Sequence, residues 1–222
     1  MKKYDLLIAL VAFLFLFSAC EKDTPSKADE TPLFPLDTDN SWTYEQTSFN
    51  GGKPEVRTYN TEPKYFYTID GYEGYSLGEY VKGEPISLIN NDTEGNCIEY
   101  LFNNDKLVHQ TILHKKDLKK GEKWTYKAAV YTNDDYSKYS IEEREKTCIA
   151  TDTIISTPKG DFSCVGISYH PGGFAKDGTP NHTMVQFLSE NVGIVKHMHY
   201  EHANGDTWLF SESVIVDYSL KK

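Results

Sequence analysis

Residues 193–218, GIVKHMHYEHANGDTWLFSESVIVDY, decide the fold class of this chain. Two runs in this stretch, 193–200 and 207–218, are rich in β-branched and aromatic residues. Asn204-Gly205 lies between them, and this dipeptide fits a type I′ turn because both central positions need a positive φ. The stretch therefore predicts two antiparallel strands joined by a tight turn.

The same pattern of short strands and turns recurs upstream. Runs at 99–102 and 107–113 flank Asn103-Asn104-Asp105, and runs at 147–156 and 162–169 flank the Pro158/Gly160 turn. Residues 140–143 (SIEE) fit a helix cap, but the β-branched residues from Thr147 onward favour a strand. We therefore predict an all-β, or nearly all-β, protein.

A short internal repeat indicates how the strands are arranged. Residues 36–44 (LDTDNSWTY) return at 118–126 as LKKGEKWTY, so a Leu, a turn and a Trp-Thr-Tyr strand start recur 82 residues apart. Trp42 and Trp124 are then expected to anchor the core. This predicts one domain over 33–222, an antiparallel twisted sheet that forms an open barrel or sandwich from two similar halves.

The charge balance excludes one class of partner. The 222 residues include 33 Asp and Glu against 23 Lys and Arg, for a net charge of −10. A body this acidic repels phosphate, so no nucleic-acid binding is expected. The hydrophobic share of 39% is enough to build a core.

The first twenty residues form a targeting segment. Lys2 and Lys3 precede an apolar run at 6–17, which is too short for a membrane span and fits a secretory signal. The following Ser18-Ala19-Cys20 resembles the lipobox of bacterial lipoproteins. That resemblance implies cleavage between Ala19 and Cys20, removal of a 1–19 signal peptide, and a diacylglycerol anchor on Cys20.

The residues after Cys20 predict a tether and a location. The segment 20–32 comprises Cys20 and a tether, in which residues 21–32 are polar, carry two prolines and have almost no apolar side chains, as is typical of a flexible linker. Glu21 and Asp23 resemble the acidic tract that directs lipoproteins of Bacteroidota to the cell surface. We expect a lipid anchor in the outer membrane, on its periplasmic or its cell-surface face.

Three cysteines remain in the body of the protein: Cys97, Cys148 and Cys164. An odd number in an exported chain allows one disulfide and one free thiol, or three free thiols. In a hairpin around Pro158 and Gly160, Cys148 and Cys164 would be offset by several residues. This offset favours buried free cysteines.

Several landmarks together resemble a family of Bacteroidota-type lipoproteins. They are 34–36 (FPL) with 40–44 (NSWTY), 118–126 (LKKGEKWTY), 157–162 (TPKGDF) and 191–196 (NVGIVK). Asp39 and Asn191 replace glycines that the family usually carries, and both residue types tolerate left-handed backbone. The resemblance implies a β-rich exported domain and brings no activity and no catalytic residues.

One segment carries candidate metal ligands. On a strand, His197, His199 and Glu201 share a face, and the Asn204-Gly205 pivot places His197 opposite Glu212 and His199 opposite Phe210. Imidazole and carboxylate suit Zn²⁺ or Cu²⁺, so His197, His199, Glu201 and Glu212 form a candidate site. Ordinary cross-strand pairs, with Glu201 beside Trp208, explain the same residues.

Aromatic residues offer a second kind of site. An exposed ring platform would suit a carbohydrate, whereas half-buried strand positions would make the rings structural. The rings crowd two regions, at Tyr65, Phe66, Tyr67, Tyr72, Tyr75 and Tyr80 and at Tyr131, Tyr136 and Tyr139.

The chain has no Gly-x-Ser-x-Gly elbow, Walker loop, HExxH or EF-hand loop, so we expect neither catalytic residues nor a cofactor. We predict a non-catalytic binding or accessory lipoprotein for a glycan or another small ligand. A structural subunit of an envelope complex is one alternative, and a metal-dependent hydrolase is the other.

Overall fold

The computed structural model describes residues 32–49, 51–82, 84–131, 139–172 and 180–221. These residues form thirteen strands and no helix, which confirms the all-β prediction. The strands are β1 (Ser41–Ser48), β2 (Glu55–Thr61), β3 (Tyr65–Ile69), β4 (Tyr72–Ser76), β5 (Ile86–Asn91), β6 (Cys97–Asn103), β7 (Lys106–His114), β8 (Lys123–Tyr131), β9 (Tyr139–Thr157), β10 (Gly160–Tyr169), β11 (His182–Ser189), β12 (Gly193–Ala203) and β13 (Asp206–Ser219).

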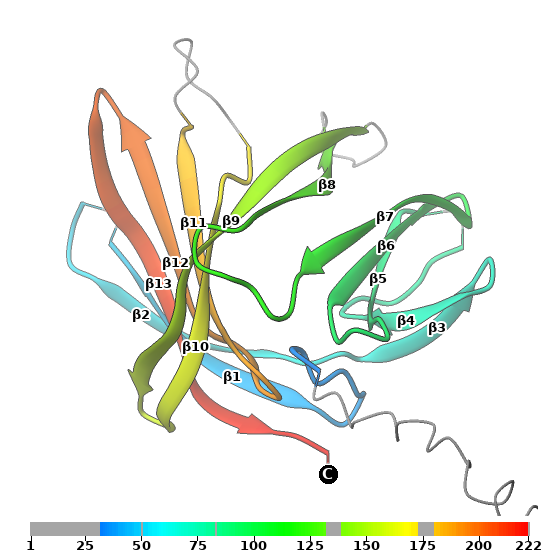
Figure 1. Cartoon of the computed structure of the whole chain (residues 1–222), viewed down its shortest axis with the longest axis horizontal. Coiled ribbons are helices and arrows are strands. Elements are labelled where there is room, and N and C mark those ends of the chain that lie inside the picture. The colour runs from blue at the N-terminus through cyan, green and yellow to red at the C-terminus, as the bar shows by residue number, and fades with distance from the viewer. Residues whose placement is uncertain (1–31, 50, 83, 132–138, 173–179, 222) are drawn as a thin grey trace, which may run out of the picture. The chain divides into compact units, whose positions relative to one another are not determined.

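The strands build two antiparallel sheets (Figure 1). The larger sheet has the order β2-β1-β13-β12-β11-β10-β9-β8, and the smaller sheet has the order β3-β4-β5-β6-β7. Each sheet has two edge strands, so neither closes into a barrel. The chain leaves the larger sheet after β2, completes the smaller sheet without interruption, and returns at β8.

All three predicted turns are present. Asn204 and Gly205 take φ values of 55° and 86° between β12 and β13, and Asn104 and Asp105 take 50° and 61° between β6 and β7. Thr157 pairs with Gly160 at the β9–β10 turn. Residues with short polar or absent side chains occupy these left-handed positions at little steric cost.

The two Trp-Thr-Tyr segments begin β1 and β8, which both belong to the larger sheet. The two similar segments therefore begin strands near opposite edges of one eight-stranded sheet. They do not belong one to each sheet, so the repeat does not correspond to the division into two sheets. Asn191 takes a φ of 58°, as expected for a residue in place of a family glycine.

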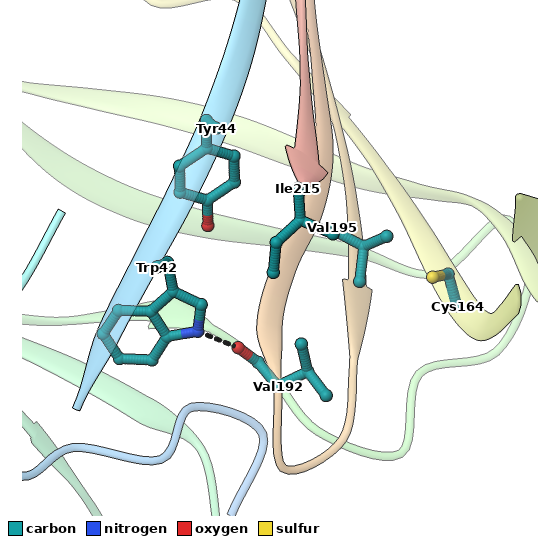
Figure 2. Packing of buried hydrophobic residues seen from close by; sticks show 6 residues of the cluster. All are labelled: Trp42, Tyr44, Cys164, Val192, Val195 and Ile215. Atoms are coloured by element: carbon teal, nitrogen blue, oxygen red, sulfur yellow. Dashed lines mark hydrogen bonds between the residues drawn. The ribbon is translucent and has the colours of Figure 1, made fainter. Parts of the chain in front are cut away.

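Trp42 anchors a core on the larger sheet (Figure 2). It is 2% exposed, and its indole Nε1 donates a hydrogen bond to the Val192 carbonyl oxygen at 2.6 Å. Val195 and Ile215, both fully buried, pack in the same cluster. The smaller sheet has a separate core around Leu88 and other buried residues, namely Ile69, Ile86 and Phe102.

Thr31–Lys222 form one compact unit, in which hydrogen bonds join the sheets. The Lys127 amide of β8 donates to Thr111 Oγ1 of β7 at 2.9 Å, and the Asn91 side-chain amide of β5 donates at 2.8 Å to the carbonyl oxygen of Phe34, which lies in the segment before β1. In the described part of the chain, no helix is long and apolar enough to cross a membrane. The predicted signal, Cys20 and the tether up to residue 31 lie outside the described residues.

Candidate functional site

A cavity of about 290 Å³ lies between the two sheets. Pockets that hold small molecules commonly have volumes of roughly 300–1,000 Å³, so this cavity is close to the lower end of that range. Both sheets and the segment before β1 contribute to it. The lining residues are Phe34, Leu36, Trp42, Tyr44, Tyr59, Thr61, Pro63, Tyr75, Ser76, Leu77, Ile89, Cys97, Leu113, His114, Lys146, Tyr169, Gln186, Ile194 and His197.

Aromatic rings form much of this lining. Tyr44 stacks on Tyr59 with ring centroids 5.4 Å apart, and Phe34 lies 5.7 Å from Trp42. The Tyr44 hydroxyl donates to the Ile194 carbonyl oxygen at 2.8 Å, and burial raises the pKa of this hydroxyl, so it stays protonated. Because main-chain oxygens occupy the polar groups of Tyr44 and Trp42, these residues offer apolar ring faces to a ligand.

β9 brings a lysine into the lining. Lys146 is 2% exposed, and its partners on the neighbouring strands are Trp124 and Tyr169. Its Nζ donates to the Leu113 carbonyl oxygen at 2.7 Å and lies 4.7 Å from the ring centroids of both Tyr126 and Tyr169. The ammonium group is therefore held by a carbonyl dipole and by two aromatic ring faces, and none of these carries a full negative charge.

The charge of Lys146 persists at neutral pH. Burial lowers its pKa to about 8, while Cys97 and Glu99 oppose that shift. Burial also raises the pKa of the Cys97 thiol to about 12, so this thiol is neutral and a poor nucleophile. The pKa of His114 is held well below its usual value by burial and then by the charge of Lys146, so His114 is neutral as well.

Three side chains of the lining, His114 among them, have buried polar atoms without a hydrogen-bond partner. These atoms are Nδ1 of His114, Oε1 of Gln186 and Nε2 of His197. Gln186 and His197 are cross-strand partners on β11 and β12. Unpaired buried polar groups are costly, by roughly 1–3 kcal/mol each, so a molecule that satisfied them would gain affinity.

The described cysteines Cys97, Cys148 and Cys164 are all free and buried, which confirms the interpretation from their spacing. Cys148 pairs with Ile167, and Cys164 pairs with Thr153, so the two cysteines are offset along the β9–β10 hairpin.

A second cluster lies on β11 and β12. His182, His199 and Glu201 place one ligand atom each within 4.8 Å of one another. Nδ1 of His182 and Nε2 of His199 are 3.1 Å apart, and His182 pairs with Glu201 across the two strands. Burial is the main reason why the pKa of His199 is lowered, which favours the neutral imidazole that metals bind.

The four predicted metal ligands do not lie together in the structure. His199 and Glu201 join the cluster, whereas His197 lines the cavity. Glu212 pairs with Met198 in the sheet and forms an ion pair with Lys196 at 2.9 Å. The expected register, with His197 opposite Glu212, is wrong, because a β-bulge between His199 and Tyr200 shifts the pairing and places His197 opposite Ser213.

Of the other two cross-strand pairs expected for this hairpin, Glu201 with Trp208 is confirmed, and His199 with Phe210 is wrong. Glu201 lies opposite Trp208. His199 pairs with Ser211, yet its ring still contacts Phe210, with centroids 5.0 Å apart. The bulge thus changes the backbone pairing and preserves the ring contact.

Of the aromatic residues singled out in the sequence, Tyr75 lines the cavity. Tyr65 and Tyr67 stack on each other at 5.7 Å, and Phe66 is 48% exposed. Tyr136 and the side chains of Tyr131 and Tyr139 lie outside the described residues.

Sequence reasoning missed Lys146, His114, Gln186 and His182. For Lys146 a signal exists, because it is two residues from Cys148 and therefore projects from the same face of β9 as that apolar residue. No comparable signal identifies His114 or Gln186, since only the pairing of distant strands brings them to one cavity.

Neither a protein-family model nor a curated protein matches the chain. Two solved structures are similar to it. One is an inferred exported protein with a YmcC-like fold from Bacteroides fragilis, with 13% identity, 84% of this chain and 98% of that chain covered, and a TM-score of 0.44. The other is an inferred lipoprotein from Parabacteroides distasonis, with 15% identity, 86% and 100% covered, and a TM-score of 0.38. Neither likeness assigns an activity to this chain.

Proposed function

We propose that this protein is a lipid-anchored binding module that holds a small, largely apolar ligand in the cavity between its two sheets. The observation that carries the proposal is the lining itself, which combines aromatic ring faces with unpaired buried atoms of His114, Gln186 and His197. Apolar walls with a few placed polar groups are typical of small-molecule sites.

The chemistry of the lining supports binding and not covalent catalysis. Its one thiol, on Cys97, is kept protonated by burial. The buried histidines His114 and His197 are neutral, since burial lowers the pKa of each. Such groups donate and accept hydrogen bonds without reacting.

Native mass spectrometry of the full chain, extracted gently from its membrane, tests the proposal. Ile89 lines the cavity, and Ile89→Trp should fill it, whereas Ile154→Trp alters a side chain that is 60% exposed. We expect a bound small molecule on the wild type and on Ile154→Trp, and its loss from Ile89→Trp. Equal ligand loads on all three proteins would place the ligand elsewhere, and bare masses on all three would argue against a resident ligand.

The anchor is a separate part of the proposal, supported by the signal-like run and the lipobox that ends at Cys20. Acyl chains supply about 0.8 kcal/mol per buried methylene, so two chains anchor a protein stably. We expect Cys20→Ala to abolish labelling of the chain by a radioactive or clickable fatty acid and to leave residues 1–19 uncleaved. Labelling that survives this substitution would contradict the anchor.

We also propose a divalent-cation site at the second cluster, on the observation that His182, His199 and Glu201 converge. A set of two histidines and one carboxylate suits Zn²⁺ with an open position. Calorimetric titration of the full chain with Zn²⁺ should show one site that His182→Ala abolishes. Glu212→Gln is the matched control, since Glu212 pairs with Lys196, and it should leave Zn²⁺ binding unchanged. Equal binding by wild type and His182→Ala would contradict the site.

A further inference from the structure

Lys146 has no carboxylate in direct contact among the described residues, although Glu99 acts on its charge from a greater distance. Among the described residues, no carboxylate forms an ion pair with this lysine. Its Nζ contacts one carbonyl oxygen and two ring faces, none of which carries a net negative charge. A buried charge without a partner of opposite sign is expensive in a folded protein.

The cavity lining differs sharply in charge from the chain as a whole. The chain has ten more acidic than basic residues, yet the lining contains one lysine, two histidines and no aspartate or glutamate. An acidic protein thus keeps a cavity with a single positive charge. This charge is surrounded by apolar rings, where electrostatic attraction is screened less than in water.

We propose, on the basis of the binding function above, that the ligand is an amphipathic organic acid whose anionic group binds beside Lys146. The apolar body of the ligand lies against the aromatic faces of the lining. The acid supplies the negative charge that the cavity lacks, and Lys146 is the residue that selects for it.

The available hydrogen-bond donors match this ligand class. An ammonium group has three donors, and the Leu113 carbonyl oxygen takes one of them. The unpaired ring nitrogens of His114 and His197 can each carry a proton as neutral imidazoles. A carboxylate has about four lone-pair positions, so it can accept from Lys146 and from a neighbouring imidazole together.

The positive charge of Lys146 gives the cavity an interaction with an anionic group that a neutral side chain could not provide. If its role were only to fill space between Tyr126 and Tyr169, an unbranched apolar residue such as methionine would suffice without the cost of desolvating a charge. Charge-assisted hydrogen bonds to an acid are about twice as strong as neutral ones, and they offset that cost when the ligand is bound.

Three single-chain probes of nearly equal chain length and with different head groups test this inference: decanoate, decan-1-ol and decyltrimethylammonium. Equilibrium dialysis of each against the full chain in nanodiscs, with empty nanodiscs subtracted, separates binding from partition into lipid. We expect decanoate to bind about tenfold more tightly than the alcohol or better, and the cation to bind least.

The variant Lys146→Met supplies the second arm. We expect its affinities for decanoate and decan-1-ol to differ by less than about twofold, with retained alcohol binding as proof that the cavity is intact. Equal binding of all three probes by the wild type, or a preference for decanoate that persists in Lys146→Met, would overturn the anionic ligand and leave the binding function standing. Failure of every probe to bind, together with bare masses in the native spectra, would overturn the binding function itself.

Discussion

The two Trp-Thr-Tyr segments have the same sequence and lie in the same sheet, yet they do different things. Trp42 is 2% exposed and bonds the Val192 carbonyl oxygen at 2.6 Å, whereas Trp124 is only partly buried and donates to the Ile112 carbonyl oxygen at 3.3 Å. Trp42 thus stabilises the core of the larger sheet, and Trp124 bridges to the smaller one.

The tyrosines of the two segments differ in the same way. The Tyr44 hydroxyl holds a main-chain oxygen, while the Tyr126 ring covers the Lys146 ammonium. β1 lies between two strands and β8 lies at the sheet edge, so the first segment meets neighbours on both sides. A local motif therefore determines where a strand starts, and the partner strands determine what the aromatic residues of that motif contact.

The largest effect expected from this comparison is on the tryptophans. Trp42→Ala should lower the free energy of unfolding by about 4 kcal/mol, because it empties a fully buried site and orphans the Val192 carbonyl. Trp124→Ala should lower the free energy of unfolding by about half as much, since the Trp124 ring is already partly exposed to solvent. Urea denaturation of both variants measures the difference, and equal losses would contradict the distinct roles.

The next effect concerns the charge that Tyr126 covers and Tyr44 does not. The pKa of Lys146 falls from 10.5 to about 8 on folding, so the unfolded chain binds more protons between these values and the stability of the wild type rises with pH there. The rise amounts to about 3 kcal/mol from pH 8 to 10.5.

Lys146→Met should lack this rise. Denaturation of wild type and variant at a series of pH values isolates the lysine, because the tyrosines titrate in both proteins and cancel. A stability difference that stays constant with pH would show that Lys146 is not buried as a cation.

The smallest effect is on the hydroxyl groups. Tyr44→Phe should destabilise the protein by about 1 kcal/mol, because the Ile194 carbonyl loses its donor. Tyr126→Phe keeps the ring that covers Lys146, so its effect should stay within about 0.5 kcal/mol. A larger loss for Tyr126→Phe would reverse the assignment of the two roles.

Short-range chemistry made the strands and turns predictable from sequence. The turns at Asn204-Gly205 and Asn104-Asp105 need a left-handed backbone, which these residue types tolerate better than most others. The positions of both turns can therefore be predicted from the local sequence alone. The extra residue at the β12–β13 bulge is different, because it depends on how the whole strand packs. That single irregularity moved His197 away from Glu212.

The candidate sites could be predicted only in part for a related reason. His199 and Glu201 lie on one strand, so alternation is enough to place them together, whereas His182 joins them from β11. The cavity needs β5, β9 and β12 to meet, and no local pattern encodes contacts between strands so far apart in sequence. The two-residue spacing between Lys146 and Cys148 predicts that Lys146 points inward, but the role of Lys146 depends on the residues that the smaller sheet brings to the cavity.

The pairing of β1 with β13 also affects how the chain reaches its native state. Ser41 lies opposite Ser219, so the first strand of the larger sheet obtains this neighbour only when the last strand has been made. Such long-range pairing is slow, since much chain entropy is lost before the contact forms. β3 to β7, in contrast, follow one another along the chain and can assemble during synthesis. We expect the smaller sheet to fold first, and the larger sheet to be completed only after β13 has been synthesised.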